Sequence, residues 1–185
     1  MNNAPLFVAS RAEIAVRLPS LSLLRHEEWQ SVYVDPATAE EWFKYSLWDY
    51  HGLGPVCLRR GDPSVQDVLA CIGSSHEDSE VAAAAYHLAN AMVESKENYA
   101  PLVSWLEALL SSVPSMRVAR NVALAVAWSS ADHAFNYRDP VGKRIEQVEG
   151  DYRHFAGVAN RAATVKAQAE ALLGSEVSQK GTSFE

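Results

Sequence analysis

Between Asp62 and Ser130 the apolar residues recur at spacings of three and four, which is the pattern of amphipathic helices. Four such segments follow one another. Their apolar stripes comprise Val65, Val68, Leu69 and Ile72; Val81, Ala84, Ala85, Leu88, Ala89 and Met92; Leu102, Trp105, Leu106, Leu109 and Leu110; and Val118, Val122, Leu124, Ala125, Val126 and Trp128. The last stripe is apolar nearly all round, which indicates a buried helix.

Each of the four segments has its own start signal. The predicted starts are Asp62-Pro63, the capping box Ser74-x-x-Glu77 with Ser75-x-x-Asp78 as its rival, Asn98, and Pro114. The connectors between segments are short, so successive helices are expected to be antiparallel neighbours. The pattern predicts a stack of helical hairpins similar to a short run of HEAT-like repeats, and a plain helical bundle is the alternative because no sequence period is evident.

The region before these helices has a different pattern. Residues 28–35 and 41–48 are β-like and rich in aromatic side chains, and the turn signal Asp35-Pro36-Ala37-Thr38 separates them. We therefore expect a β-hairpin, with a helix opening at Thr38 as the competing prediction. The predicted fold is mainly α, with a short N-terminal β-hairpin packed on antiparallel helices and a helical C-terminal extension.

Beyond residue 138 the apolar positions alternate in steps of four and three. This heptad-like seam comprises Val141, Ile145, Val148, Tyr152, Phe155, Ala159, Ala162, Lys166, Ala169 and Leu173. Glycines interrupt it, so we expect two helices with a break near Gly150, packed on the body or on a second copy of the chain. The predicted organisation is a globular domain over 1–138 (aromatic region 1–61, helices 62–130), a helical extension over 139–173 and a disordered tail over 174–185.

Charge is distributed unevenly. The 185 residues carry a net charge of −7. Residues 62–107 hold eight acidic residues and one basic residue, Lys96, so the net charge of this segment equals that of the whole chain. Such a balance argues against nucleic-acid binding, which needs clustered Lys and Arg. It suits a basic protein partner, although an acidic helical face also keeps a protein soluble.

Composition is that of an ordinary globular protein, with 48% hydrophobic and 21% charged residues. The N-terminus lacks the pattern of a signal peptide, and no stretch reaches the roughly 18 apolar residues of a membrane span. We expect a cytoplasmic protein without membrane contact. Cys57 and Cys71 lack the paired spacing of a zinc site, so we expect two buried or half-buried thiols.

No catalytic signature is evident along the chain. There is no glycine-rich phosphate loop, no His-Glu-x-x-His and no Gly-x-Ser-x-Gly. We predict no catalytic residue, no cofactor and no metal site. An unrecognised enzyme site around Asp49, His51, Arg59 and Arg60 remains an alternative.

An aromatic cluster precedes the helices. It comprises Trp29, Tyr33, Trp42, Tyr45, Trp48 and Tyr50. Most of these side chains are expected in the core, and a minority on a binding face, where Trp, Tyr and Arg concentrate interaction energy.

One stretch of this region carries a family resemblance. Two predicted strands are followed by His51-Gly52-Leu53-Gly54-Pro55, then Leu58-Arg59-Arg60, then an Asp62-Pro63 helix start. Over residues 29–69 the chain resembles small immunity proteins of bacterial polymorphic toxin systems, although Leu53 stands where the family has a glycine. The resemblance implies a cytoplasmic inhibitor that binds and masks one cognate toxin.

These observations together predict a protein that acts by binding. The expected partner is a cognate toxin with a basic surface, and a homodimer through the C-terminal helix is a further expectation. A helical-repeat adaptor or scaffold without inhibitory role is the alternative. The predicted partner-binding residues are Trp48, Asp49, Tyr50, Asp67, Glu77, Asp78, Glu80, Glu94 and Glu97.

Overall fold

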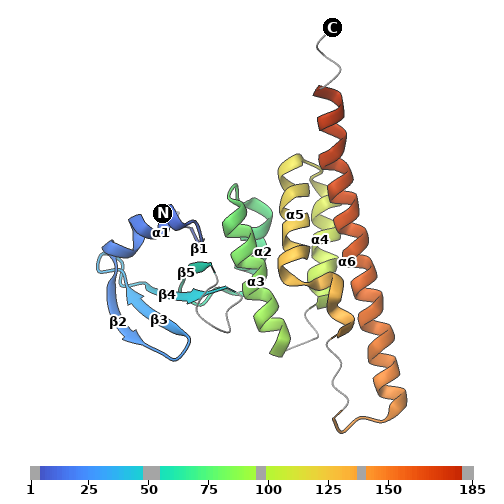
Figure 1. The fold of residues 1–185 in the computed structure, drawn as a ribbon, viewed down its shortest axis with the longest axis horizontal. Coiled ribbons are helices and arrows are strands. Elements are labelled where there is room, and N and C mark those ends of the chain that lie inside the picture. The colour runs from blue at the N-terminus through green and yellow to red at the C-terminus, as the bar shows by residue number, and fades with distance from the viewer. Residues whose placement is uncertain (1–4, 48–54, 95–98, 137–140, 181–185) are drawn as a thin grey trace. The chain divides into compact units, whose positions relative to one another are not determined.

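A computed structural model describes residues 5–47, 55–94, 99–136 and 141–180, with the side chains of 90–94, 135–136 and 175–180 excepted (Figure 1). The chain divides into two compact units, residues 1–86 and 87–185. The protein is mainly helical, as predicted, and carries a five-stranded antiparallel sheet near its N-terminus. The domain bounds expected from the sequence stay a prediction.

The N-terminal unit is built on this sheet. Its elements are β1 (Phe7–Val8), α1 (Arg11–Arg17), the 3-10 helix η1 (Leu18–Ser20), β2 (Ser22–His26), β3 (Gln30–Val34), β4 (Glu41–Ser46), β5 (Val56–Arg60), α2 (Val65–Ser74) and the start of α3 (Asp78–Glu94). The strand order is β1-β5-β4-β3-β2. The predicted hairpin forms its centre, and β1, β2 and β5 extend it on both sides.

The β3–β4 hairpin is confirmed, with Val32 paired to Phe43 in antiparallel register. The Asp35 carboxylate accepts a hydrogen bond from the Ala37 backbone N–H at 2.9 Å, and the Asp35 N–H donates to the Glu40 carbonyl at 2.9 Å. Ala39 adopts a left-handed φ of 59°, which a helix starting at Thr38 would exclude. The competing helix is therefore wrong, because local turn chemistry closes the hairpin.

The sequence missed the other three strands. The apolar spacing predicts no strand over residues 22–26 or 56–60, which form β2 and β5. Two- to five-residue strands carry too few alternating positions to be recognised alone. Pairing with their neighbours defines them.

One face of the sheet packs beneath α1 and η1. Its core cluster comprises Val8, Ile14, Leu21, Trp42 and Leu58, with Leu18, Tyr33 and Val56 packed against it. Of the predicted aromatic cluster, Trp42 is fully buried and Tyr33 and Tyr45 are partly buried, whereas Trp29 is 74% exposed. Burial of a side chain such as that of Trp42 contributes roughly 1.5–3 kcal/mol.

The predicted start of α2 at Asp62 is wrong by two residues. Ser64 is the N-cap: its side chain accepts from the Asp67 N–H, while the Asp67 carboxylate accepts from the Ser64 N–H. This reciprocal pair satisfies two of the free donors at the helix start. Asp62 is too far upstream and pairs instead with Arg59 at 2.7 Å.

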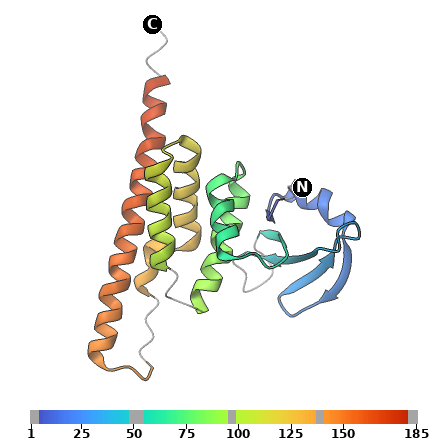
Figure 2. The ribbon, with the colours of Figure 1, turned by 180° about the vertical axis from the view of Figure 1, so that it is seen from behind.

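The C-terminal unit is helical (Figures 1 and 2). After the end of α3 it contains α4 (Tyr99–Ser112), α5 (Met116–Ser129), the 3-10 helix η3 (Ala131–Asn136) and α6 (Ile145–Lys180). Ser115, one residue beyond the predicted Pro114, caps α5 by accepting from the Val118 N–H. The predicted cap Asn98 lies outside the described residues.

The long helix α6 packs along α4, α5 and η3. Phe155, Val158, Ala159, Ala162, Val165 and Ala169 are buried on its inner face. The predicted seam therefore packs on the body only in part: Phe155, Ala159, Ala162 and Ala169 are buried, whereas Val141, Ile145 and Tyr152 are exposed. Lys166, the charged residue of that seam, pairs with Asp132 at 3.3 Å.

The predicted helix break near Gly150 is wrong. α6 runs without interruption through Gly150 and Gly157 and continues to Lys180, into the stretch expected to be disordered. A glycine inside a helix costs about 1 kcal/mol, and burial of the apolar face offsets this. Within the described residues, no helix combines the length and apolar character needed to cross a membrane.

Candidate functional site

A groove in the N-terminal unit gathers acidic side chains. It has a volume of about 990 Å³. Its lining residues are Pro5, Leu6, Glu40, Glu41, Arg60, Gly61, Asp62, Pro63, Asp67, Ala70, Cys71, Ser74, Ser75, His76, Glu77 and Glu80. Six of them are carboxylates and one is an arginine, so the groove carries excess negative charge.

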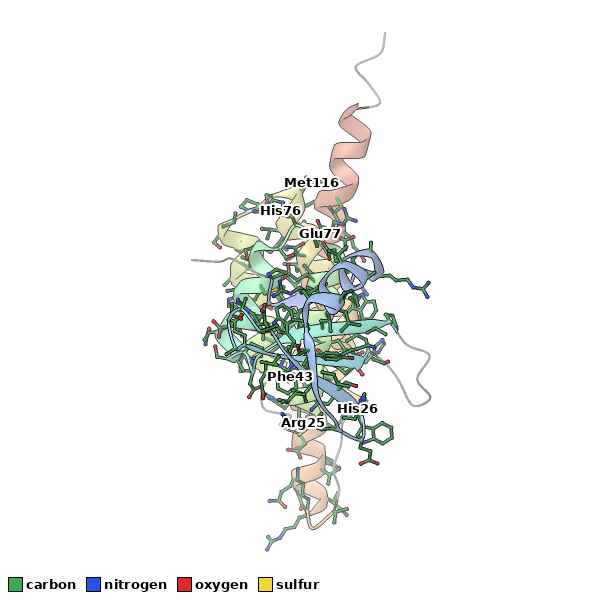
Figure 3. The ribbon with its side chains drawn as sticks, turned by 90° about the vertical axis from the view of Figure 1, so that its left-hand side faces the viewer. Arg25, His26, Phe43, His76, Glu77 and Met116 are labelled. Atoms are coloured by element: carbon green, nitrogen blue, oxygen red, sulfur yellow. The ribbon has the colours of Figure 1, made fainter. Side chains whose placement is uncertain are left out.

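Three local features bring these residues together. The turn that follows Asp35 ends at the start of β4, which places Glu40 and Glu41 at one end of the sheet. β5 ends at the same sheet end, where Gly61 has a φ of +57° that glycine accepts readily. The chain then enters α2, and the α2–α3 connection supplies His76 and Glu77 (Figure 3).

Only part of the negative charge is compensated within the unit. Arg60 lies 3.7 Å from Glu40, and Arg25 donates to Glu41 at 3.3 Å. Hydrogen bonds from the side chain and backbone of Ser64 lower the pKa of Asp67 below its ordinary value, so this group stays ionised.

The inner wall of the groove is held by Ser75. Its hydroxyl donates to the Glu80 carboxylate at 2.6 Å and accepts from the Glu77 N–H at 3.1 Å. Glu80 is therefore fixed, whereas the neighbouring Glu77 is exposed. The groove thus combines a hydrogen-bonded carboxylate, Glu80, with an exposed one, Glu77.

The structure brings together three of the predicted partner-binding residues. Asp67, Glu77 and Glu80 line the groove, and Asp78 begins α3 without being part of the lining. Glu94 ends α3, and its side chain lies outside the described part of the chain. Trp48, Asp49, Tyr50 and Glu97 also lie outside the described residues.

Sequence reasoning missed three acidic residues of the groove. The sequence pattern assigns Glu41 to the start of a strand and Asp62 to a helix cap, and it gives Glu40 no role. The available signal was the adjacent pair of glutamates beside a turn. Their approach to α2 depends on the pairing of β4 with β5, which places Trp42 opposite Arg60.

Arg59 and Arg60 do not converge on one site. Successive strand residues point to opposite faces of a sheet. Arg59 lies over the Phe43 ring, 4.5 Å from its centroid, whereas Arg60 lines the groove. The alternative enzyme site would need Arg59 and Arg60 on the same face of the sheet, and they lie on opposite faces. The other two residues of that site, Asp49 and His51, lie outside the described residues.

Both thiols are held in the protonated form. Cys57 is buried, and burial raises the pKa of its thiol to about 12. Cys71 lines the groove, and burial together with the nearby Glu80 carboxylate also raises the pKa of its thiol. The nucleophile of cysteine chemistry is the thiolate, so neither group is activated.

Among the residues that the structure describes, no group of three or more His, Cys, Asp or Glu side chains is arranged to hold a metal ion. No family model, curated protein or solved structure matches this chain.

Proposed function

We propose that this protein is a cytoplasmic immunity protein that binds one cognate bacterial toxin and occludes it through an acidic surface centred on the groove. The observation that carries the proposal is the lining of the groove, which holds six carboxylates, three of them paired with Arg25, Arg59 and Arg60. A toxin with a basic surface complements such a site. Binding is the whole activity in this proposal, with no bond made or broken.

The groove is suited to basic side chains in size as well as in charge. A volume of about 990 Å³ accepts several side chains of a partner loop. Complementary potentials raise the association rate and reject partners of the wrong charge. The exposed Glu77 at the rim is placed to steer encounter, while Glu80 and Asp67, held by serine hydroxyls, present fixed acceptors.

The proposal keeps the remaining sequence-based residues as contacts beyond the groove: Trp48, Asp49, Tyr50, Asp78, Glu94 and Glu97. It also keeps the HEAT-like stacking of the central helices, because stacked helices would extend the acidic surface carried by residues 62–107. The family resemblance over residues 29–69 supports the same function, since β4, β5 and α2 each contribute a residue of that stretch to the groove: Glu41, Arg60 and Asp67.

The test uses the toxin gene that the proposal expects beside the gene of this protein. Expression of that toxin should stop bacterial growth, and co-expression of this protein should restore it. The Glu77→Lys variant should bind the purified toxin roughly tenfold more weakly, with the loss mainly in the association rate at low salt. Glu77 has the advantage of being exposed.

Glu13→Lys is the matched control. It makes the same charge change at an exposed position of α1 in the same unit, away from the groove. The two variants should therefore differ in toxin binding while unfolding at the same temperature. Equal binding by both variants, or growth arrest that this protein leaves unchanged, would contradict the proposal and favour an adaptor role.

A further inference from the structure

β2 forms an open edge of the sheet. It is the last strand in the order β1-β5-β4-β3-β2, and within the described residues it pairs only with β3 (Figure 1). All five of its side chains are exposed. An edge strand presents a row of unpaired backbone N–H and C=O groups, and another extended strand is the structure that matches them.

We propose that this edge is a self-association surface, on which β2 of a second copy of the chain pairs antiparallel about His26. The two sheets would then continue into one another through a two-fold axis. This goes beyond the proposed function, and it places the dimer contact on the sheet instead of the C-terminal helix. The argument rests on the direction of the backbone groups, on charge, and on exposed apolar side chains.

The backbone direction follows from the turn between β2 and β3. The Glu27 N–H donates to the Gln30 carbonyl at 2.8 Å, and His26 is the next residue along, opposite Ser31. Bonded and non-bonded pairs alternate in an antiparallel ladder. The N–H and C=O of His26 therefore point away from β3, toward the open edge.

A β-bulge limits where a second strand can pair. The register of β2 against β3 shifts between Leu23 and Arg25, so the regular part of the edge runs from Arg25 to Glu27. His26 lies at the centre of this regular part. An antiparallel pair of identical strands centred there gives both copies the same contacts, as two-fold symmetry requires.

Charge complementarity selects a second copy as the occupant. Arg25 and Glu27 flank His26 on the same side of the strand, and the Arg25 Nε donates to the Glu27 carboxylate at 2.7 Å. In a pair centred on His26, Arg25 of each copy faces Glu27 of the other. The result is a ring of four alternating charges, whereas a foreign strand would have to supply both signs in the right order.

Two exposed apolar side chains lie near this edge. Leu23 is 51% exposed and Trp29 is 74% exposed. Leu23 belongs to β2, and Trp29 lies in the β2–β3 turn that follows the regular part of the edge. Exposed apolar side chains of this size are typical of an interaction site.

The test is sedimentation equilibrium of the full chain over a wide concentration range. The wild type should show a monomer–dimer equilibrium. Arg25→Glu and Glu27→Arg should each raise the dissociation constant roughly tenfold or more, because like charges then meet across the edge. Mixing the two variants should restore association, since one carries only acids and the other only bases at these positions.

Leu23→Lys should also weaken the dimer, because lysine on an edge strand opposes pairing. Val16→Lys is its matched control, at an exposed apolar position of α1. Circular dichroism of each variant establishes that it is folded. A monomer at every concentration would overturn the proposal. So would a dimer that ignores the β2 variants but is lost in Ile145→Lys, which would place the contact on α6.

Discussion

The guanidinium of Arg17 lies over the indole ring of Trp42, with its central carbon 4.6 Å from the ring centroid. The same guanidinium donates to the Asp35 carboxylate at 3.0 Å. One side chain of α1 thus joins the buried tryptophan of β4 to the turn that closes the β3–β4 hairpin. The contact combines a cation–π interaction with a partly buried ion pair, and it holds α1 on the sheet.

Arg17→Ala should therefore lower the free energy of unfolding by about 1–2 kcal/mol, because Asp35 and the indole face lose their common partner. Arg17→Lys should lie between this variant and the wild type, since an ammonium keeps the charge but not the planar stacking. Urea denaturation followed by tryptophan fluorescence measures both values. An equal loss in the two variants would show that the stacking contributes nothing.

The capping box of α2 gives a second prediction. Ser64→Ala should destabilise the protein by about 1 kcal/mol, because the Asp67 N–H loses its acceptor at the helix start. Asp62→Ala should cost only a few tenths of that, since the Asp62 side chain is 92% exposed and its ion pair with Arg59 is a surface one. Thermal unfolding of the two variants decides whether Ser64 or Asp62 begins the helix. A larger loss of stability in Asp62→Ala than in Ser64→Ala would show that Asp62 is the N-cap of α2.

The docking of α6 should depend on packing more than on its ion pair. Phe155→Ala should cost about 3 kcal/mol, because its ring is buried on the inner face of α6. Arg161→Ala should cost less than about 1 kcal/mol, although Arg161 bonds both Glu107 and Ser104 of α4, because the pair is exposed to solvent. Chemical denaturation of both variants compares the two. Similar losses would mean that the ion pair fixes the helix.

The same ion pair predicts a pH dependence. The hydrogen bond from Arg161 lowers the pKa of Glu107 below its ordinary value of 4.5. A carboxylate with a lowered folded pKa adds stability above the ordinary value and loses it as the pH falls through the folded value. The difference in stability between wild type and Arg161→Ala should thus be fully present above the ordinary value of 4.5 and shrink as the pH falls below it. A difference that grew on acidification would contradict this assignment.

The two thiols should react slowly in the native protein. Burial raises the pKa of both thiols, that of Cys57 to about 12, so almost no thiolate exists at neutral pH. Alkylation by iodoacetamide at about pH 8 should be much slower than in urea, with Cys57 slowest because its side chain is fully buried. Mass spectrometry of timed samples reports each rate. Rapid native labelling of Cys57 would show that the thiol is accessible or activated.

The sequence by itself determined the elements that carry a strong local signal. Apolar spacing placed α2, α4 and α5 within a few residues, because each helix buries one face and its periodicity records that face. The Asp35-Pro36 turn predicted the position of the β3–β4 hairpin. Its hydrogen bond from the Ala37 N–H to the Asp35 carboxylate is local, so it forms without contacts to distant residues. The excess of acidic residues over 62–107 predicted that the candidate site carries negative charge.

Tertiary structure decided what depends on residues far apart in the chain. β2 and β5 form because they pair with β3 and β4. α6 runs through Gly150 because its inner face is buried. Glu40 and Glu41 line one groove with Glu77 because the sheet and the α2–α3 connection both contribute to its walls. Each of these outcomes rests on contacts between distant segments. Local propensity amounts to tenths of a kcal/mol per residue, and burial of several side chains exceeds it.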